Sequence, residues 1–394
     1  MVKKKESAGK DLLNWCRSKL VIFLDHIYSK DKRIIICGSS NGRQFYGCPR
    51  VIYDYLVKEC AKEFDTYYYL NEGPSDDSRC LRKGGNFNWK TIKTVLRAKT
   101  VIGSHGQQDF GPWKLSSKKL FIHTGHGFPI KAVALANKSV SKDEVAGWKR
   151  MNELVDVELA SSDIMAELLS KGHGYEVGRF LVVGQPKNDK LVAPRPEGRP
   201  MFLDKLPEYK KIVFYCPTFR DWGPARLFPF NDFDNARLEK FLEDNKMVIL
   251  VRYHINEGEP PSKLLGGRCV DFSYDKFPDV ENEDVLHYID SIMTDYSSIY
   301  CDFLLLDRPL IFLPYDLEKY MQRRGFMVDD YDKWSPGPKP GNFEDFLKAL
   351  KDLAEGKDDF KADRERVNEW INAKQTANTP EKVVEYIRKE LAKH

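Results

Sequence analysis

Short, continuous apolar runs alternate with longer amphipathic stretches along the first half of the chain. Residues 33–37 are typical: the run is apolar after Arg33 and ends in Gly38, Ser39 and Ser40, as expected of a buried parallel strand that enters a loop. By the same criteria we expect strands at 66–70, 100–103, 120–123 and 151–160, and helices at 49–63, 89–98 and 161–171. This alternation predicts an α/β domain with a parallel sheet.

A second alternation occupies the C-terminal half. It predicts strands at 211–216, 247–252, 268–271, 291–294 and 310–313, and helices at 235–244, 281–289, 297–306, 343–355 and 378–392. Five prolines interrupt the pattern between residues 185 and 210, which indicates a linker. We therefore expect two α/β domains, at 1–190 and 205–375, with a cleft between them. The last helix, at 376–394, is expected to cross back to the first domain.

The N-terminal stretch at residues 10–30 has apolar residues at spacings that suit a helix with one apolar face. We favour a helix packed on the first domain; contact with a membrane surface, helped by Lys3, Lys4 and Lys5, is the alternative. Its longest apolar run, at residues 20–24, is far shorter than the ~20 residues that span a bilayer. We expect a protein without a spanning helix on the cytoplasmic side.

Composition narrows the function classes. The 394 residues include 63 Lys and Arg and 59 Asp and Glu, a net charge of +4, whereas nucleic-acid-binding domains are commonly strongly basic. The 8 Cys form no CxxC pair and no Cys/His cluster with zinc spacing. We therefore expect reduced thiols, no nucleic acid partner, no cofactor and no metal.

The segment from Ser291 to Asp302 runs from an apolar strand through a small polar turn into a helix. Backbone N–H groups and the hydroxyls of Ser297 and Ser298 at such a helix start can hold a phosphate. The alternative, which local chemistry favours, is that Ser297 or Asp295 merely caps the helix.

Two further strand ends carry candidate ligands. Thr218 and Arg220 follow the strand 211–216, and Arg252 and His254 stand at the end of the strand 247–252. Arg suits bidentate phosphate binding, and strand carboxyl ends line the ligand crevice of open α/β sheets. Polar residues at three separate strand ends are harder to explain as helix caps than polar residues at one strand end.

In the first half, Gly125 and Gly127 bracket His126 in a tight loop after the strand 120–123. An uncrowded imidazole can take a proton from a hydroxyl near neutral pH, although an ordinary loop histidine is an equally good interpretation. His123, on the strand, is expected to be a core or orienting residue, and the loop around His105 makes a weaker candidate.

Taken together, the motifs resemble the CDP-glycerol glycerophosphotransferases of teichoic acid and capsule synthesis, and especially the shorter, primase-like members. The resemblance covers residues from about 105 to 340 in family order. It rests on the stretches 126–131 (HGFPIK), 184–189 (GQPKND), 217–220 (PTFR), 252–254 (RYH) and 294–302 (TDYSSIYCD), followed by Arg308-Pro309, 314–316 (PYD), Tyr320 and 324–326 (RGF).

The resemblance implies a GT-B-like fold of two Rossmann-like domains, with the acceptor bound mainly by the first and CDP-glycerol by the second. It places the general base on His126 and a second important histidine on His254. The implied donor-binding residues are Thr218, Arg220, Arg252, Asp295, Ser297 and Ser298, and the implied acceptor-side or orienting residues are Lys131, Asn188 and Asp189. Phe128, Lys187 and Ile255 depart from the family pattern, and Phe128 removes a hydroxyl beside the base.

The predicted reaction moves glycerol phosphate from CDP-glycerol to a hydroxyl of a lipid-linked acceptor and releases CMP. It would occur at the inner face of the cytoplasmic membrane, with the protein peripherally bound. Transfer from CDP-ribitol or another CDP-polyol is the alternative within the family. Outside it remain a nucleotide-sugar glycosyltransferase or epimerase, and a non-catalytic peripheral membrane protein.

Overall fold

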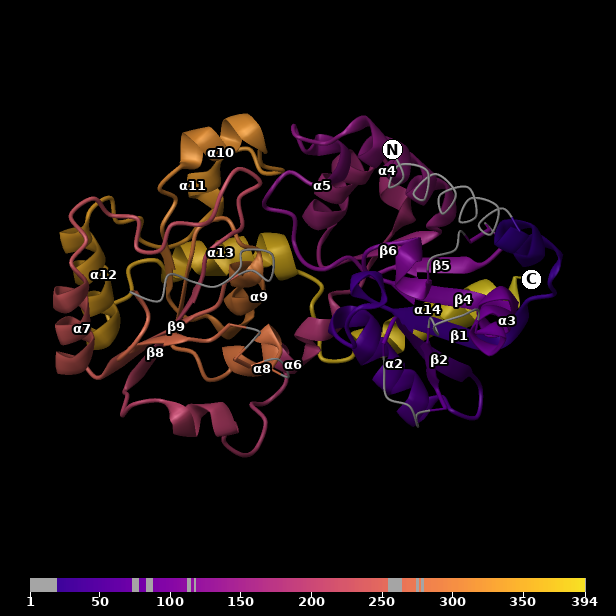
Figure 1. Ribbon diagram of the computed structural model, residues 1–394, viewed down its shortest axis with the longest axis horizontal. Coiled ribbons are helices and arrows are strands. Elements are labelled where there is room, and N and C mark those ends of the chain that lie inside the picture. The colour runs from indigo at the N-terminus through magenta and orange to yellow at the C-terminus, as the bar shows by residue number, and fades with distance from the viewer. Residues whose placement is uncertain are drawn as a thin grey trace, which may run out of the picture. The chain divides into compact units, whose positions relative to one another are not determined.

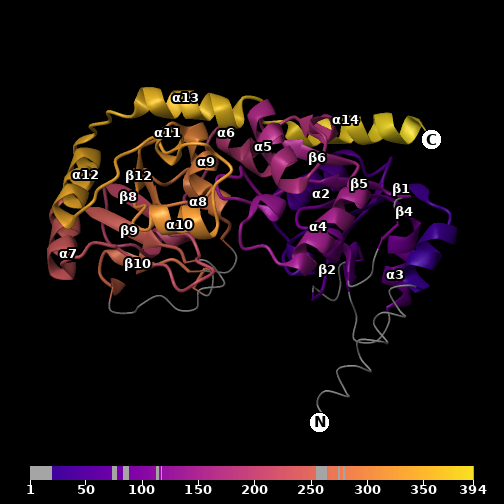
Figure 2. The ribbon, with the colours of Figure 1, turned by 90° about the horizontal axis from the view of Figure 1, so that it is seen from above.

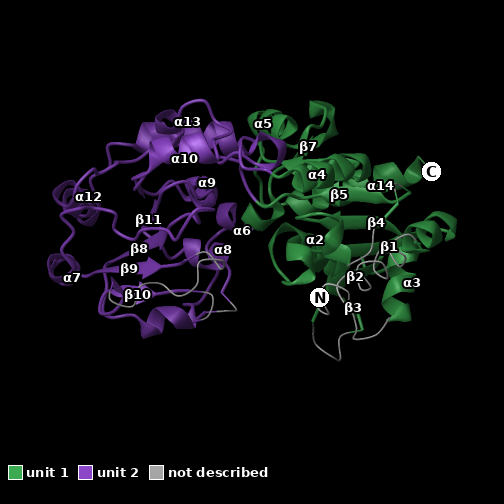
Figure 3. Cartoon of the chain, turned by 45° about the horizontal axis from the view of Figure 1, so that its top comes forward, with its two compact units in different colours: residues 1–126, 141–189, 374–394 green, residues 127–140, 190–373 purple. Residues whose placement is uncertain are grey.

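The computed structural model describes residues 20–72, 78–82, 88–111, 115–116, 118–253, 264–273, 276–277 and 280–393. The chain forms two compact units (Figure 3). Unit 1 comprises Met1–His126, Ser141–Asp189 and Lys374–His394, and unit 2 comprises Gly127–Val140 and Lys190–Ala373. The C-terminal segment therefore belongs to the first unit, whereas residues 127–140, which we expected in the first domain, pack with the second.

Unit 1 is built on a parallel sheet of seven strands (Figure 1). The strands are β1 (Asp31–Gly38), β2 (Asp65–Leu70), β3 (Cys80–Arg82), β4 (Ala98–Gly103), β5 (Leu120–His123), β6 (Val157–Ala160) and β7 (Phe180–Val182). Their order, β3-β2-β1-β4-β5-β6-β7, is that of a doubly wound Rossmann sheet, with the topological switch between β1 and β4.

Helices cover both faces of this sheet (Figures 1 and 2). They are α2 (Gly47–Glu59), α3 (Trp89–Arg97), α4 (Lys142–Leu154), α5 (Asp163–His173) and α14 (Thr379–Ala392). Ile35 of β1 packs in the core that contains residues of α2 and α14, while Ile36 packs in the core that contains residues of α3 and α4. Because successive strand residues point to opposite faces, burial of both explains the continuous apolar run.

Unit 2 holds a second parallel sheet, of five strands. They are β8 (Lys211–Cys216), β9 (Met247–Val251), β10 (Cys269–Asp271), β11 (Ser291–Thr294) and β12 (Leu310–Phe312), in the order β10-β9-β8-β11-β12. This order puts a topological switch between β8 and β11. The two sheets confirm the expected α/β class with parallel strands.

The helices of unit 2 are α7 (Asn235–Asp244), α8 (Asn282–Leu286), α9 (Ile299–Phe303), α10 (Leu317–Arg323), α11 (Tyr331–Trp334), α12 (Phe343–Glu355) and α13 (Lys361–Asn372). α12 shows why the sequence folds this way. Asn342 caps its first turn by accepting from the Asp345 N–H, and Gly356 ends it in the left-handed conformation. Phe346, Leu350 and Leu353, at helical spacing, then enter the core.

One expectation about local structure was wrong. Residues 151–154 are helical and not extended, because Ser141 and Glu144 form a capping box that starts α4, which continues to Leu154. The boundary between the units, at Asp189 and Lys190, falls within the predicted linker, where Pro186–Asn188 and Met201–Lys205 form 3₁₀ turns and α6 spans Asp189–Val192.

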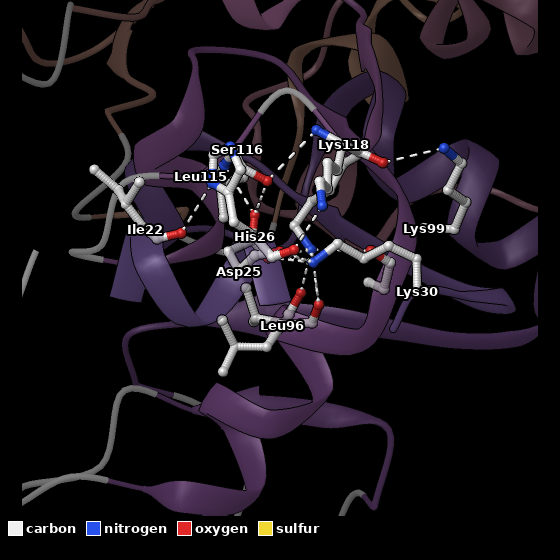
Figure 4. Close-up of polar contacts among 12 residues, drawn as sticks. Ile22, Asp25, His26, Lys30, Leu96, Lys99, Leu115, Ser116 and Lys118 are labelled. Atoms are coloured by element: carbon white, nitrogen blue, oxygen red, sulfur yellow. Dashed lines mark hydrogen bonds and ion pairs between the residues drawn. The ribbon is translucent and has the colours of Figure 1, made fainter. Parts of the chain in front are cut away.

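Residues 20–27 are helical and are anchored to unit 1 by Asp25 (Figure 4). The buried Asp25 carboxylate lies 2.9 Å from Lys119 Nζ, and it accepts from the backbone N–H of Ser116 at 2.8 Å. Lys119 Nζ also donates to the carbonyls of Val95 and Ala98 at the end of α3, where a cation is favoured. None of the described helices is long and apolar enough to cross a membrane.

Candidate active site

In unit 2, the loops after β8 and β11 lie side by side at the topological switch. β8 and β11 pair directly, with Cys216 opposite Thr294, so the chain that follows each strand emerges at the same edge of the sheet. Thr294 Oγ1 donates to the Cys216 carbonyl at 2.6 Å, which joins the two strand ends. Ligands of open α/β sheets bind at this kind of edge.

Asp295 is the centre of this edge. Its buried carboxylate accepts from the backbone N–H of Thr218 at 2.9 Å and from that of Tyr296 at 2.6 Å. The second oxygen accepts from Arg220 Nη1 at 2.6 Å. The structure thus brings together Thr218, Arg220 and Asp295, three of the predicted donor-binding residues.

Arg220 is almost completely buried, at 2% exposure, and is held by two carboxylates. Besides Asp295, it donates to Asp316 through Nε at 3.2 Å and Nη2 at 2.8 Å, and it lies over the ring of Tyr296. Burial alone would lower the pKa of Arg220, but Asp295 and Asp316 raise it overall. The guanidinium ties three segments together; its contact with a phosphate stays a prediction.

Arg252 follows β9, the strand next to β8. It is buried, donates to the carbonyls of Phe272 at 2.9 Å and Val280 at 2.8 Å, and lies over the Phe272 ring. These contacts fix its orientation at the sheet edge. His254, the second predicted histidine, lies outside the described residues.

Ser297 and Ser298 are partly buried, in the turn after β11. The helix that follows is shorter than expected: α9 has five residues and passes into a 3₁₀ turn, Leu304–Leu306. Ser298 makes no side-chain capping bond to α9. Gly127 comes so close that a β-carbon there would lie 3.3 Å from Ser298 Oγ, so two motifs distant in sequence meet in unit 2.

Lys131 also lies in unit 2, where it forms an isolated antiparallel bridge with Phe326. Burial lowers the pKa of Lys131 to about 8, with a further contribution from Arg324, while Asp295 opposes the shift. Its ammonium is therefore an electrostatic neighbour of Asp295 and not part of unit 1, where we expected the acceptor-side residues.

In unit 1, His126 lies in the loop after β5, separated from His123 by Thr124 and Gly125, and it is exposed. The ring stacks on that of His105, with centroids 4.9 Å apart and planes 15° apart. Although the residue is exposed, the protein around its ring lowers the pKa of His126 through desolvation, and the nearby rings of His105 and His123 lower it further. A lowered pKa keeps the imidazole neutral, as a general base must be.

The loop that carries His105 is organised by Asp109, which the sequence did not single out. Its buried Oδ2 accepts from the backbone N–H groups of Ser104 at 2.8 Å and His105 at 2.7 Å. The Ser104 hydroxyl lies 2.8 Å from His105 Nδ1. An acidic residue three positions after Gly106 was the available signal, because such a carboxylate can reach back to the turn.

Asn188 and Asp189 are buried in unit 1. Asp189 accepts from the backbone N–H of Thr379 at 2.7 Å and from Gln375 Nε2 at 2.8 Å, so it holds the start of α14. Burial raises the pKa of Asp189 to about 6. The structure gives Asp189 a packing role; an acceptor role for either residue stays a prediction.

Sequence comparison finds relatives over most of the chain. The profile of the family described as "CDP-Glycerol:Poly(glycerophosphate) glycerophosphotransferase" matches residues 20–389. The chain is similar to the teichoic acid glycerol-phosphate transferase of Staphylococcus aureus, with 28% identity over 84% of this chain and 86% of the relative. It is 26% identical to the teichoic acid poly(glycerol phosphate) polymerase of Bacillus subtilis, but covers only 44% of it.

Solved structures show the same fold. The wall teichoic acid polymerase TagF, in a histidine variant soaked with CDPG, superimposes with a TM-score of 0.79 at 20% identity, over 100% of this chain and 99% of that one. A putative UDP-N-acetylglucosamine 2-epimerase from Listeria monocytogenes is more distant, with a TM-score of 0.54 at 12% identity over 92% and 98% of the two chains. The chain belongs to the CDP-glycerol:poly(glycerophosphate) glycerophosphotransferase family, whose members transfer a substituted phosphate group.

Proposed function

We propose that this enzyme transfers glycerol phosphate from CDP-glycerol to a hydroxyl of a lipid-linked acceptor and releases CMP. The observation that carries the proposal is the cluster in unit 2, where Thr218 and Asp295 are hydrogen-bonded at the switch point of a Rossmann sheet and Ser298 follows in the turn after β11. Teichoic acid enzymes among its relatives are glycerol-phosphate transferases and polymerases, and TagF was solved with CDPG.

The donor pyrophosphate would lie against the carboxyl edge of the unit 2 sheet. Thr218 Oγ1 is buried and has no hydrogen-bond partner among the described residues, so it can donate to a phosphate oxygen without breaking another bond. The Ser297 and Ser298 hydroxyls offer further donors. Arg252, oriented by the Phe272 and Val280 carbonyls, would supply positive charge at this edge. The charge of Arg220, in contrast, is offset by Asp295 and Asp316.

His126 would act as the general base. The acceptor hydroxyl gives its proton to the His126 imidazole while its oxygen bonds to the phosphorus that bears glycerol. The bond from that phosphorus to the CMP oxygen breaks, and CMP leaves with the electron pair. Lys131 and, by resemblance, His254 would stabilise the charge that develops on the phosphates.

We further propose that the enzyme works at the membrane surface, where a lipid-linked acceptor resides. The helix at residues 20–27 supports this: Val21 is buried against Ile92 and Leu96, whereas Leu20, Phe23 and Ile27 are 50%, 61% and 60% exposed. An exposed apolar face on an anchored helix suits the interface of a bilayer. Replacing Phe23 with Glu should reduce cosedimentation with anionic vesicles and leave the fold intact.

The test of the activity is to incubate the full chain with a short-chain lipid acceptor analogue and either CDP-glycerol or CDP-ribitol, then measure CMP and weigh the product. Release of CMP with a mass gain of glycerol phosphate supports the proposal. If transfer from CDP-ribitol is faster than from CDP-glycerol, the donated group is ribitol phosphate and not glycerol phosphate. Release of UDP from a UDP-sugar, with no CMP from either CDP-polyol, would overturn it.

A further inference from the structure

Three buried side chains from separate elements of unit 1 converge on one point. His123 ends β5, Glu158 lies on β6 and His173 ends α5, and their exposed fractions are 2%, 0% and 5%. His123 Nδ1 lies 3.1 Å from Glu158 Oε1, and His173 Nδ1 lies 2.8 Å from Glu158 Oε2. If each of the three residues offers one ligand atom, these atoms lie within 4.8 Å of one another.

The contact between His123 and Glu158 lacks hydrogen-bond geometry, but it forms an ion pair when His123 is protonated. Burial alone would lower the pKa of His123, whereas Glu158 raises it overall. Neither His123 Nδ1 nor Glu158 Oε1 has a hydrogen-bond partner among the described residues. The other ring nitrogen, Nε2, lies 3.0 Å from the Ser104 carbonyl, which can only accept, so Nε2 carries a proton. Two lone-pair-bearing atoms then face each other at 3.1 Å, unless a proton or a cation lies with them.

A proton shared between two atoms needs a nearly straight alignment, whereas a metal ion does not. Donor atoms bonded tetrahedrally to one ion at ~2.0–2.2 Å lie roughly 3.3–3.6 Å apart. The 3.1 Å and 2.8 Å contacts of Glu158 are shorter, so both would lengthen when an ion binds. Two imidazoles and a glutamate are moreover a ligand set that zinc uses. A metal-bound histidine characteristically donates its other N–H to a carbonyl, as His123 does to Ser104.

The surroundings hold the ligands in place. Gly125 borders the cluster, because a β-carbon there would lie in van der Waals contact with Glu158 Oε1, at 3.6 Å. Trp148 stacks on the His173 ring at 4.8 Å with an interplanar angle of 11°. Glu158 supplies a negative charge that offsets part of the charge of a divalent cation in the buried site.

We propose that His123, Glu158 and His173 form a binding site for a divalent transition metal ion with the ligand preference of Zn²⁺. The ligands are buried, so the ion is taken up as unit 1 folds and stabilises the sheet behind the His126 loop. Binding uses both Nδ1 lone pairs: a proton on His123 Nδ1 passes to solvent, and the proton on His173 moves to Nε2 or to solvent. No spacing motif marks this site, because its ligands lie on three elements far apart in the chain.

The experiment uses the full chain, purified without chelator. Its metal content is measured by mass spectrometry, and the stripped protein is titrated with ZnCl₂ by calorimetry. We expect about one ion per chain and a higher melting temperature with Zn²⁺. E158Q and H173Q should each lose more than about 100-fold in affinity, because loss of even an outer-shell partner costs 10–100-fold. H26Q, at an exposed histidine outside the cluster, should bind as the wild type does.

A wild type that neither retains nor binds Zn²⁺ would overturn the site, and so would E158Q and H173Q proteins that bind it unchanged. If the variants fail to fold, Co²⁺ bound to the wild type decides. Absorption bands of a site with nitrogen and oxygen ligands support the proposal, and the spectrum of hexaaqua Co²⁺ contradicts it. None of these measurements depends on transferase activity.

Discussion

Gly127 and Ser298 lie so close together that a β-carbon on Gly127 would be 3.3 Å from Ser298 Oγ. The backbone of Gly127 also has a φ of +135°, which L side chains rarely adopt. Gly127→Ala should therefore strain the loop and displace Ser298. Because small misplacements of reacting groups can cost about 100-fold in rate, we expect kcat/KM for CDP-glycerol to fall by about that factor.

Gly178→Ala is the matched control for this change. Gly178 is exposed, and a β-carbon there would meet no atom within 4 Å. The control should keep both rate and melting temperature. Equal rates for Gly127→Ala and Gly178→Ala would show that the Gly127–Ser298 approach is irrelevant to transfer.

His126→Ala should remove general base catalysis. We expect kcat to fall by roughly 10²–10⁴-fold, while the Kd for CDP-glycerol, measured by calorimetry, stays within about twofold. His26→Ala, at an exposed histidine on the N-terminal helix, serves as the control. Full turnover in the His126 variant would refute its role.

The pH profile offers a separate test of the same residue. Desolvation, together with His105 and His123, lowers the pKa of His126, so the neutral base persists as pH falls. The acid limb of kcat/KM should therefore lie below the ordinary histidine value of about 6.5. An acid limb at or above that value would mean that another group titrates or that the ring is freely hydrated.

Hydrophobic periodicity predicted most of the fold because both sheets are parallel and buried on both faces. Runs such as residues 211–216 and 291–294 are continuous and apolar, so β8 and β11 coincide with their predicted ranges. β7 and α13 were missed for opposite reasons. β7 is a short strand of three partly buried residues, and α13 is rich in charged residues that face solvent, with Val367 and Ile371 among its few buried apolar positions.

The site was harder to predict than the fold, because the sequence shows which residues follow a strand but not what they contact. The sequence analysis named Thr218, Arg220 and Asp295. Their spacing does not reveal that Arg220 forms ion pairs with both Asp295 and Asp316. Asp109 was missed because its role is to accept backbone N–H groups, and its position three residues after Gly106 signals a turn and not a chemical site.

Thr218→Val should separate donor binding from stability. Valine keeps the shape of threonine but lacks the hydroxyl, which is buried and has no partner among the described residues, so the melting temperature should not fall. If Thr218 donates to the pyrophosphate, KM for CDP-glycerol should rise by about 10-fold, the value of one hydrogen bond to a charged group, and Thr218→Ser should restore it.

Thr100→Val is the control for this substitution. Thr100 lies on β4, is fully buried, and its hydroxyl likewise has no partner in the described part of the chain. Its KM should match that of the wild type. The donor role of Thr218 would be refuted if its Val variant also kept the wild-type KM.

Asp25→Asn should destabilise the enzyme through the buried network that anchors the N-terminal helix. Asp25 and Lys119 are almost fully buried, at 0% and 1% side-chain exposure. Removing the Asp25 charge therefore leaves the Lys119 charge buried without this partner. Breaking such a pair costs about 3–5 kcal/mol, to be measured by urea unfolding at neutral pH. Asp65→Asn, whose exposed carboxylate lies 3.5 Å from Arg33, should cost less than about 1 kcal/mol.

The difference between wild type and Asp25→Asn should also depend on pH in a fixed direction. Burial alone would raise the pKa of Asp25, but Lys119, Lys30 and Ser116 lower it overall. A carboxyl whose pKa is lower in the folded state stabilises the fold above its unfolded value, about 3.9, and loses that contribution as pH falls through the folded value. The gap in unfolding free energy should thus shrink below about pH 4. A gap that widened in acid would mean that folding favours protonated Asp25.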